Sequence, residues 1–129
     1  MIKKTKEGKK KILLVEDDPF LIDIYTTKLE QNNFIVETVN NGEEALEKIN
    51  DNWPDLLLLD IVLPRVDGWE VLRKIKESPG LKDLKIVILS NLSQAQEVKK
   101  GFDLGATSYL IKSHYAPSEI VEEIKKILL

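Results

Sequence analysis

Several polar residues of this 129-residue chain stand directly after short apolar runs, where their chemistry could be combined. The acidic triplet Glu16-Asp17-Asp18 follows one such run, and Asp60 follows four consecutive leucines. Ser90 and Lys112 close two later runs. Carboxylates that lie close together repel one another unless a cation is present, and Mg²⁺ prefers such oxygen ligands. Carboxylates with a metal, facing a lysine and a hydroxyl, are suited to handling phosphoryl groups.

The apolar runs themselves are predicted to be strands that position these residues. Each run has four to six mostly apolar residues bounded by charged or turn residues, which is typical of buried strands. Near-continuous apolarity, as in Leu56–Leu59, is expected of a central parallel strand covered on both faces. The predicted strands span residues 11–16, 34–39, 55–60, 85–90 and 107–111.

Segments with helical periodicity lie between and after these strands. Asp18 is interpreted as the cap of the first helix rather than as a metal ligand, because Pro19 follows it at the first helical position. Asn41, with Glu44 three residues later, predicts a second capped helix. Three further helices are predicted from about residue 67 to 78, from about 93 to 104 with Gly105 after its end, and from about 117 onward.

Five strands alternating with five helices predict an α/β fold of (βα)5 type. This is a doubly wound, parallel five-stranded sheet with helices on both faces, and its expected strand order is the flavodoxin-like 2-1-3-4-5. In such a sheet the binding crevice lies at the carboxyl ends of the strands, near the switch point between the first and third. The strand ends that carry Glu16, Asp60, Ser90 and Lys112 are therefore expected to meet there.

Composition excludes several other kinds of site. The chain has no cysteine and one histidine, His114, which excludes disulfide scaffolds, thiolate chemistry and a multi-histidine zinc site. No apolar run approaches the ~18 residues of a membrane span, so no membrane association is expected. The prediction is a cytoplasmic protein.

Charge is unevenly distributed along the chain. Residues 1–11 carry six lysines and one glutamate, a net +5, so the total of −3 leaves −8 for the remaining residues. This acidic body argues against direct nucleic-acid binding. Residues 1–10 are predicted to be a basic, disordered leader, and residues 11–129 one folded domain.

Four motifs together resemble those of response-regulator receiver domains of two-component signalling, and in particular the single-domain chemotaxis response regulator. They are LLVEDD at residues 13–18, LDIVLPRVDG at 59–68, ILS at 88–90 and YLIK at 109–112. Each motif alone is weakly specific, but the four occur in the family's order and at fitting spacing. The resemblance covers residues 11–129 and implies that they form one receiver domain.

The resemblance implies that Asp60 accepts a phosphoryl group from a phosphohistidine on a sensor histidine kinase or a phosphotransfer protein. Lys112 would bind one phosphoryl oxygen and Ser90 another, although Lys112 could also pair with Asp60. Tyr109 matches the aromatic switch residue, whose ring turns inward when Ser90 moves. The signal would then reach a downstream protein partner through the face of the fourth helix, fifth strand and fifth helix. Such a protein is not an enzyme, since it catalyses only its own phosphorylation and dephosphorylation.

The resemblance also implies a resident Mg²⁺ ion as cofactor. Asp17 would be a direct ligand, and Glu16 would act through a water molecule. Asp60 and the backbone carbonyl of Val62 match the remaining protein ligands.

Four positions depart from the family pattern. Asn91 stands where alanine is common, and it could narrow donor access or add a hydrogen bond. Ser113 stands where a cis-proline is usual; because a cis bond before a non-proline residue costs about 3 kcal/mol, the Lys112–Ser113 bond is predicted to be trans. Arg65 and Val66 replace the commoner glycine and methionine, a change expected to be tolerated.

Two apolar positions predict slow autodephosphorylation. In receiver domains, the residues two after the acceptor and two after the hydroxyl residue influence how water reaches the acyl phosphate. Here they are Val62 and Leu92, neither of which can orient a nucleophilic water.

Other functions are left as alternatives. A degenerate receiver that binds partners without phosphorylation is the main one, on account of Asn91 and Ser113. An aspartate-nucleophile phosphatase of the haloacid dehalogenase type is disfavoured, because the first strand lacks Asp-x-Asp and no cap domain is present. A flavodoxin is disfavoured because no Gly/Ser/Thr-rich phosphate loop follows that strand. With no output domain after the fifth helix, either a single-domain regulator or a piece of a longer one is expected.

Overall fold

A parallel sheet forms the centre of the molecule in the computed structural model, which describes residues 8–51 and 54–129. Within these residues the sheet has five strands in the order β2-β1-β3-β4-β5, and every neighbouring pair is parallel. This confirms the predicted doubly wound, flavodoxin-like topology. The strands are β1 (Lys11–Val15), β2 (Ile35–Val39), β3 (Leu56–Leu59), β4 (Lys85–Ser90) and β5 (Ser108–Ile111).

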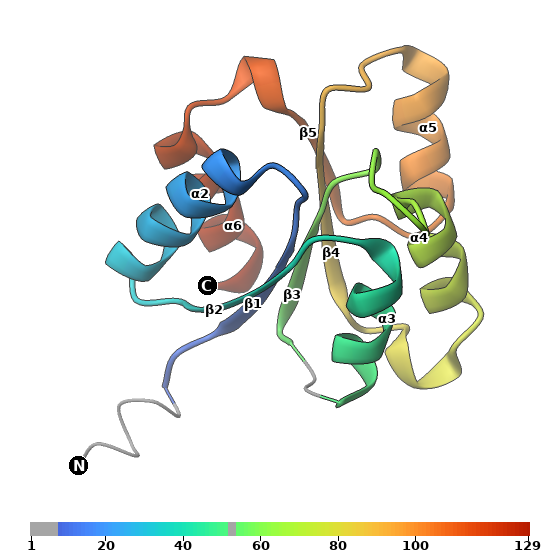
Figure 1. Cartoon of the computed structure of the whole chain (residues 1–129), viewed down its shortest axis with the longest axis horizontal. Helices are drawn as coiled ribbons and strands as arrows, with labels where there is room; N and C mark the ends of the chain where they lie inside the picture. Colours follow the sequence, from blue (N-terminus) through green and yellow to red (C-terminus); the bar gives the residue numbers. More distant parts are fainter. Residues whose placement is uncertain (1–7, 52–53) are drawn as a thin grey trace.

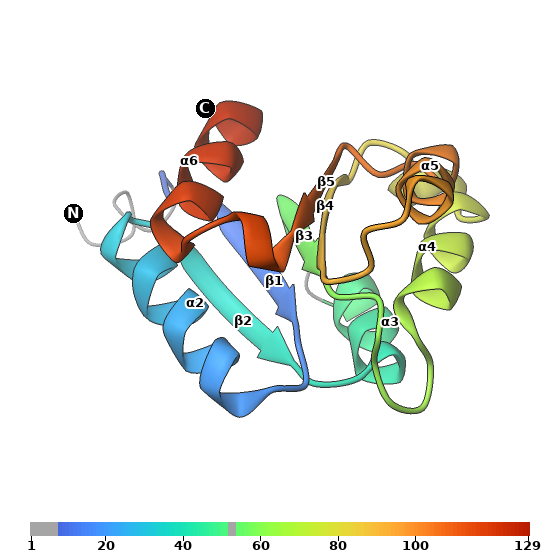
Figure 2. The ribbon, with the colours of Figure 1, turned by 90° about the horizontal axis from the view of Figure 1, so that it is seen from above.

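Helices cover both faces of the sheet. In Figures 1 and 2, α2 and α6 lie on one side, and α3, α4 and α5 lie on the other. The helices are α2 (Pro19–Gln31), α3 (Gly42–Asp51), α4 (Gly68–Lys76), α5 (Ala95–Asp103) and α6 (Pro117–Leu128), with short 3₁₀ turns η1 (Pro79–Leu81) and η2 (Lys112–His114).

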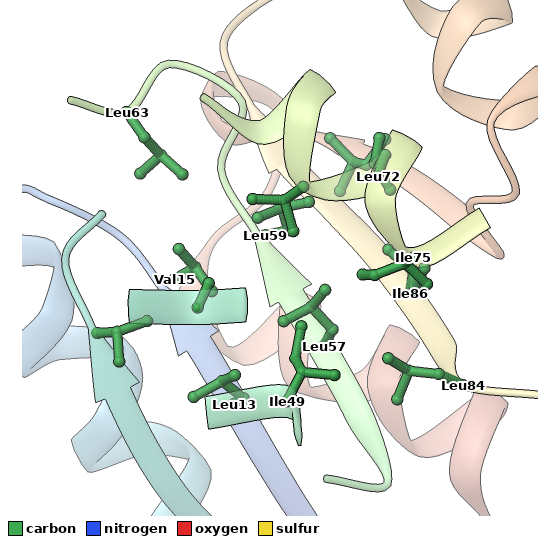
Figure 3. Close-up of a cluster of buried hydrophobic side chains, with 14 of the residues drawn as sticks. Leu13, Val15, Ile49, Leu57, Leu59, Leu63, Leu72, Ile75, Leu84 and Ile86 are labelled. Carbon is green, nitrogen blue, oxygen red and sulfur yellow. The ribbon is translucent and has the colours of Figure 1, made fainter. Parts of the chain in front are cut away.

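The four leucines of β3 explain the two-sided packing. All four are fully buried, and they alternate between two apolar clusters because successive side chains of a strand point to opposite faces. Leu57 and Leu59 pack in the cluster under α3 and α4, part of which is drawn in Figure 3. Leu56 and Leu58 pack in the cluster under α2 and α6. Both layers are thus anchored on the strand that precedes Asp60.

The helix ends mostly follow the predicted caps. The Asp18 side chain accepts hydrogen bonds from the backbone N–H groups of Phe20 (2.9 Å) and Leu21 (3.4 Å), as expected of a cap. The Asn41 side chain likewise accepts from the N–H of Glu44 at 2.9 Å.

The start of α5 is a correction, since the helix begins at Ala95 and not near Ser93. The capping residue is Gln94, whose N–H donates to the Glu97 side chain at 3.1 Å. The Glu97 N–H in turn donates to the Gln94 backbone carbonyl at 2.9 Å, and these two contacts place the start of the helix at Ala95. Gly105, with φ +103°, follows α5 as predicted.

Most of the predicted leader, residues 1–7 of 1–10, lies outside the described residues. At its end, the Lys10 carbonyl accepts a hydrogen bond from the N–H of Ile35 at 2.9 Å. None of the described helices is long and apolar enough to cross a bilayer.

Candidate functional site

Strand register brings the two principal acidic positions side by side. Val15 at the end of β1 pairs with Leu59 at the end of β3, so Glu16 and Asp60 both follow directly at the carboxyl edge of the sheet. The Asp60 N–H donates to the Val15 carbonyl at 3.0 Å, which continues the pairing beyond the strands. The two carboxyl groups are therefore placed by the backbone of the central strands rather than by a flexible loop.

Three carboxylates form one cluster at this edge. Glu16, Asp17 and Asp60 each offer an oxygen atom, and these atoms lie within 4.8 Å of one another. Glu16 and Asp60 are buried, whereas Asp17 is exposed. Oxygen-only donors, with one open side for water, suit a hard divalent cation that keeps several water ligands, as Mg²⁺ does. The residues present thus fit a magnesium ion.

Lys112 supplies the positive charge beside this cluster. Its Nζ atom lies 2.8 Å from Asp60 Oδ2 and 2.8 Å from Glu16 Oε1, and its side chain is only 13% exposed. Burial lowers the pKa of Lys112, but the hydrogen bonds to Asp60 and Glu16 outweigh burial and hold that pKa above its usual value. Burial also raises the pKa of the Glu16 carboxyl, against the opposing effect of Lys112. Removing Lys112 would leave the two buried carboxylates of Glu16 and Asp60 without a compensating positive charge.

Ser90 ends β4, the strand next to β3, and is fully buried. Its hydroxyl accepts a hydrogen bond from the N–H of Leu92 at 3.3 Å. The Val62 N–H lies 3.4 Å from Asp60 Oδ1, a long hydrogen bond. The loop after Ser90 and the loop after Asp60 therefore both contact the site through backbone N–H groups.

Tyr109 connects β5 to the loop after Ser90. Its hydroxyl donates to the carbonyl of Leu92 at 2.7 Å, and its ring is partly buried. Burial raises the pKa of this hydroxyl, and the carboxylates of Glu97 and Asp60 add to the rise. The ring packs against Gly101 of α5, where an added Cβ atom would lie 2.9 Å from Tyr109 Cδ2 and 2.7 Å from Ile88 Cδ1.

The sequence reasoning missed this role of Gly101. A glycine inside a helical pattern costs helix stability, so it is a recognisable signal of close packing. A glycine at this position lets α5 approach the tyrosine ring.

Three of the four positions that depart from the family pattern have a distinct place in the structure. Every peptide bond of the described residues is trans, Lys112–Ser113 included, as predicted. Asn91 is exposed beside the site. Arg65 has a φ of +67°, the left-handed region that glycine adopts more easily, and its guanidinium lies 3.5 Å from Glu43. The loop thus tolerates an arginine there in a conformation that favours glycine.

A doubly wound sheet with an acidic cluster, a lysine and a hydroxyl at its switch point is typical of proteins that bind a cation and a phosphoryl group. Residues 12–125 match the family model of the response regulator receiver domain, and the chain belongs to this family. Receiver domains belong to two-component response regulators and are generally not ordinary enzymes.

The chain is also similar to curated regulatory proteins. The alkaline phosphatase synthesis transcriptional regulatory protein PhoP of Bacillus subtilis is 36% identical over 121 residues, which are 92% of this chain and 48% of that protein. The chain spans about half the length, or less, of the curated relatives it matches.

Two solved structures are similar over most of their length. The phosphorylated cyanobacterial phytochrome response regulator RcpA is 36% identical with a TM-score of 0.79, covering 93% of this chain and 91% of that one. The Mn²⁺-bound form of response regulator Rcp1 is 30% identical with a TM-score of 0.83, covering 93% and 94%.

Proposed function

We propose that this chain is a phosphoacceptor receiver that takes a phosphoryl group onto Asp60 from a phosphohistidine of a sensor histidine kinase or phosphotransfer protein. The observation that carries the proposal is the buried Asp60 carboxylate, held at 2.8 Å by Lys112 within the Glu16-Asp17-Asp60 cluster. The phosphorylated state of the related RcpA supports the same chemistry.

The transfer is an in-line displacement at phosphorus. A carboxylate oxygen of Asp60 forms the new P–O bond, the P–N bond of the donor breaks, and its electron pair returns to the imidazole ring. Lys112, already beside Asp60 Oδ2, would neutralise one phosphoryl oxygen. The Ser90 hydroxyl would leave the Leu92 N–H and donate to a second oxygen.

Glu16, Asp17, Asp60 and the backbone carbonyl of Val62 would hold the Mg²⁺ ion. When bound, the ion offsets the negative charge that gathers between carboxylate and phosphoryl group. The exposed Asp17 can bind it directly. Both oxygens of Glu16 already accept hydrogen bonds, from Lys112 and from the Asp18 N–H (3.2 Å), which favours a water-mediated role. The Mn²⁺-bound form of the related Rcp1 supports a divalent ion.

Movement of Ser90 would change the position of the Tyr109 side chain. The Leu92 backbone touches both residues, because its N–H reaches Ser90 and its carbonyl reaches the Tyr109 hydroxyl. A shift of this loop would therefore change the ring's contact with α5. The surface formed by α5, β5 and α6 would then present the change to a downstream protein.

The acyl phosphate is expected to be long-lived. The Val62 side chain is 62% exposed but apolar, and Leu92 is half-buried and apolar, so neither orients a water molecule. The double substitution Val62→Asn with Leu92→Glu should speed loss of the phosphoryl group, measured by intact mass against time. An unchanged rate would contradict this explanation.

Intact-protein mass after incubation with acetyl phosphate and Mg²⁺ tests the proposal. We expect a gain of one phosphoryl group in the parent and in Asp83→Asn, a matched change at an exposed aspartate at the far edge of the sheet. The gain should be lost in Asp60→Asn and without metal. No gain under any condition, including with phosphoramidate, would instead support a receiver that binds partners without phosphorylation.

A further inference from the structure

α5 is joined to the acceptor site on two sides, at the adjacent residues Lys100 and Gly101. On the sheet side, Gly101 lies against the Tyr109 ring, whose hydroxyl binds the Leu92 carbonyl in the loop after Ser90. The proposed function already uses this path. The contact at Lys100 belongs to a second path, which runs through α4.

The second path starts at the main chain of the acceptor. The N–H of Gly68 donates to the Ile61 carbonyl at 2.8 Å, and a Cβ atom on Gly68 would lie 2.5 Å from the carbonyl oxygen of Asp60. The first residue of α4 therefore packs directly on the backbone of the acceptor segment, with no side chain between them. Trp69 is the next residue, so a displacement of this segment moves the indole ring.

The indole ring in turn contacts α5. Lys100 Nζ lies 4.4 Å from the centroid of the Trp69 ring, within the range of a cation–π interaction. Trp69 also packs against the apolar cluster under α3 and α4. At the opposite end of α4, Lys76 Nζ donates to the Asp103 carbonyl at the end of α5 at 2.8 Å. Two lysine contacts thus join α4 to α5.

We propose that Trp69 and Lys100 are positioning residues that couple the state of Asp60 to α5 through α4, independently of Ser90 and Tyr109. This inference rests on the proposed function, since phosphorylation of Asp60 is the event transmitted. The contact joins α4 to α5 in the same structure in which Lys112 holds Asp60, so we expect it to support this arrangement of the acceptor site. Loss of the contact should slow phosphorylation roughly two- to fivefold, which is the change in rate that the free energy of an exposed cation–π pair corresponds to.

Trp69 itself provides the readout. The chain has two tryptophans, so a Trp53→Phe background leaves Trp69 as the single indole. Acetyl phosphate and Mg²⁺ are added, and intact mass and indole emission are followed on the same sample. In this parent we expect phosphorylation to change the emission. In Lys100→Met the emission change should fall by at least half and phosphorylation should slow as stated, whereas Lys100→Arg should restore both, because a guanidinium stacks on an aromatic face.

Two further variants separate the paths. Lys99→Met, the matched loss of an exposed neighbouring lysine that pairs with Asp103 at 2.8 Å, should behave as the parent. Tyr109→Ala should keep the Trp69 response, because the path through α4 does not pass through that ring. An unchanged response and rate in Lys100→Met would overturn the inference and leave the proposed function standing. A parent that gains no mass would overturn the proposed function and this inference with it.

Discussion

α5 and α6 flank the same strand, β5, yet they are held in different ways. α6 buries three branched apolar side chains, Ile120, Val121 and Ile124. α5 buries a single residue, Gly101, and its apolar Val98 is only half-buried. Polar contacts of Lys100 with Trp69, and of Lys76 with the Asp103 carbonyl, also join α5 to α4.

This difference separates a fixed helix from a movable one. Each buried aliphatic side chain stabilises the folded state by about 1.5–3 kcal/mol, so α6 is anchored. Exposed polar contacts contribute far less, which places α5 among the elements that open at low free energy. The helix that contacts Tyr109 is thus the one that can move without unfolding the domain.

The largest expected effect lies on the anchored side. Ile124→Ala removes a fully buried side chain and should lower the free energy of unfolding by about 2–5 kcal/mol. Urea unfolding followed by circular dichroism measures it. A loss below about 1 kcal/mol would mean that α6 is no better anchored than α5.

Gly101→Ala should have the next largest effect. The added methyl group would lie within 3 Å of Ile88 and Tyr109, and this overpacking should outweigh the gain of about 1 kcal/mol in helix propensity. We expect a net loss of about 1–2 kcal/mol in urea unfolding, with altered chemical shifts of the Tyr109 ring. Gly80→Ala, where an added Cβ meets nothing within 4 Å, is the control. A stabilised Gly101→Ala would show that α5 simply moves outward without cost.

Tyr109→Phe should have a smaller effect. It removes the 2.7 Å hydrogen bond to the Leu92 carbonyl and keeps the ring against Gly101, so a loss of about 0.5–1.5 kcal/mol is expected. Equilibrium unfolding against the parent measures the change. A variant as stable as the parent would indicate that the hydroxyl bond does not hold the loop.

Phe102→Ala should have the smallest effect. Phe102 is 47% exposed and packs in neither apolar cluster, so a change within about 0.5 kcal/mol is expected. The same urea titration applies. A loss comparable to that of Ile124→Ala would remove the distinction between the two helices.

The sheet topology and the position of the acidic cluster were predictable, because parallel strands place their carboxyl ends at one edge. The positions of Asp60 and Glu16 could be predicted because each residue directly follows an apolar run. The second ion pair of Lys112, to Glu16, was not predicted, since it depends on where a long side chain ends. The Lys100–Trp69 contact was also missed, because it depends on how α4 and α5 are rotated about their axes. The sequence motifs therefore predict where the strands end, but they do not predict how the helices are rotated about their axes.

Amide hydrogen exchange with and without acetyl phosphate, in the presence of Mg²⁺, tests the central claim most directly. If phosphorylation of Asp60 is transmitted to a movable α5, protection should change in α5 and in the loop after Ser90. Protection in α6 should stay constant, and Asp60→Asn should show no change anywhere. Equal changes in α5 and α6, or a phosphorylated protein with no change in α5, would contradict the account.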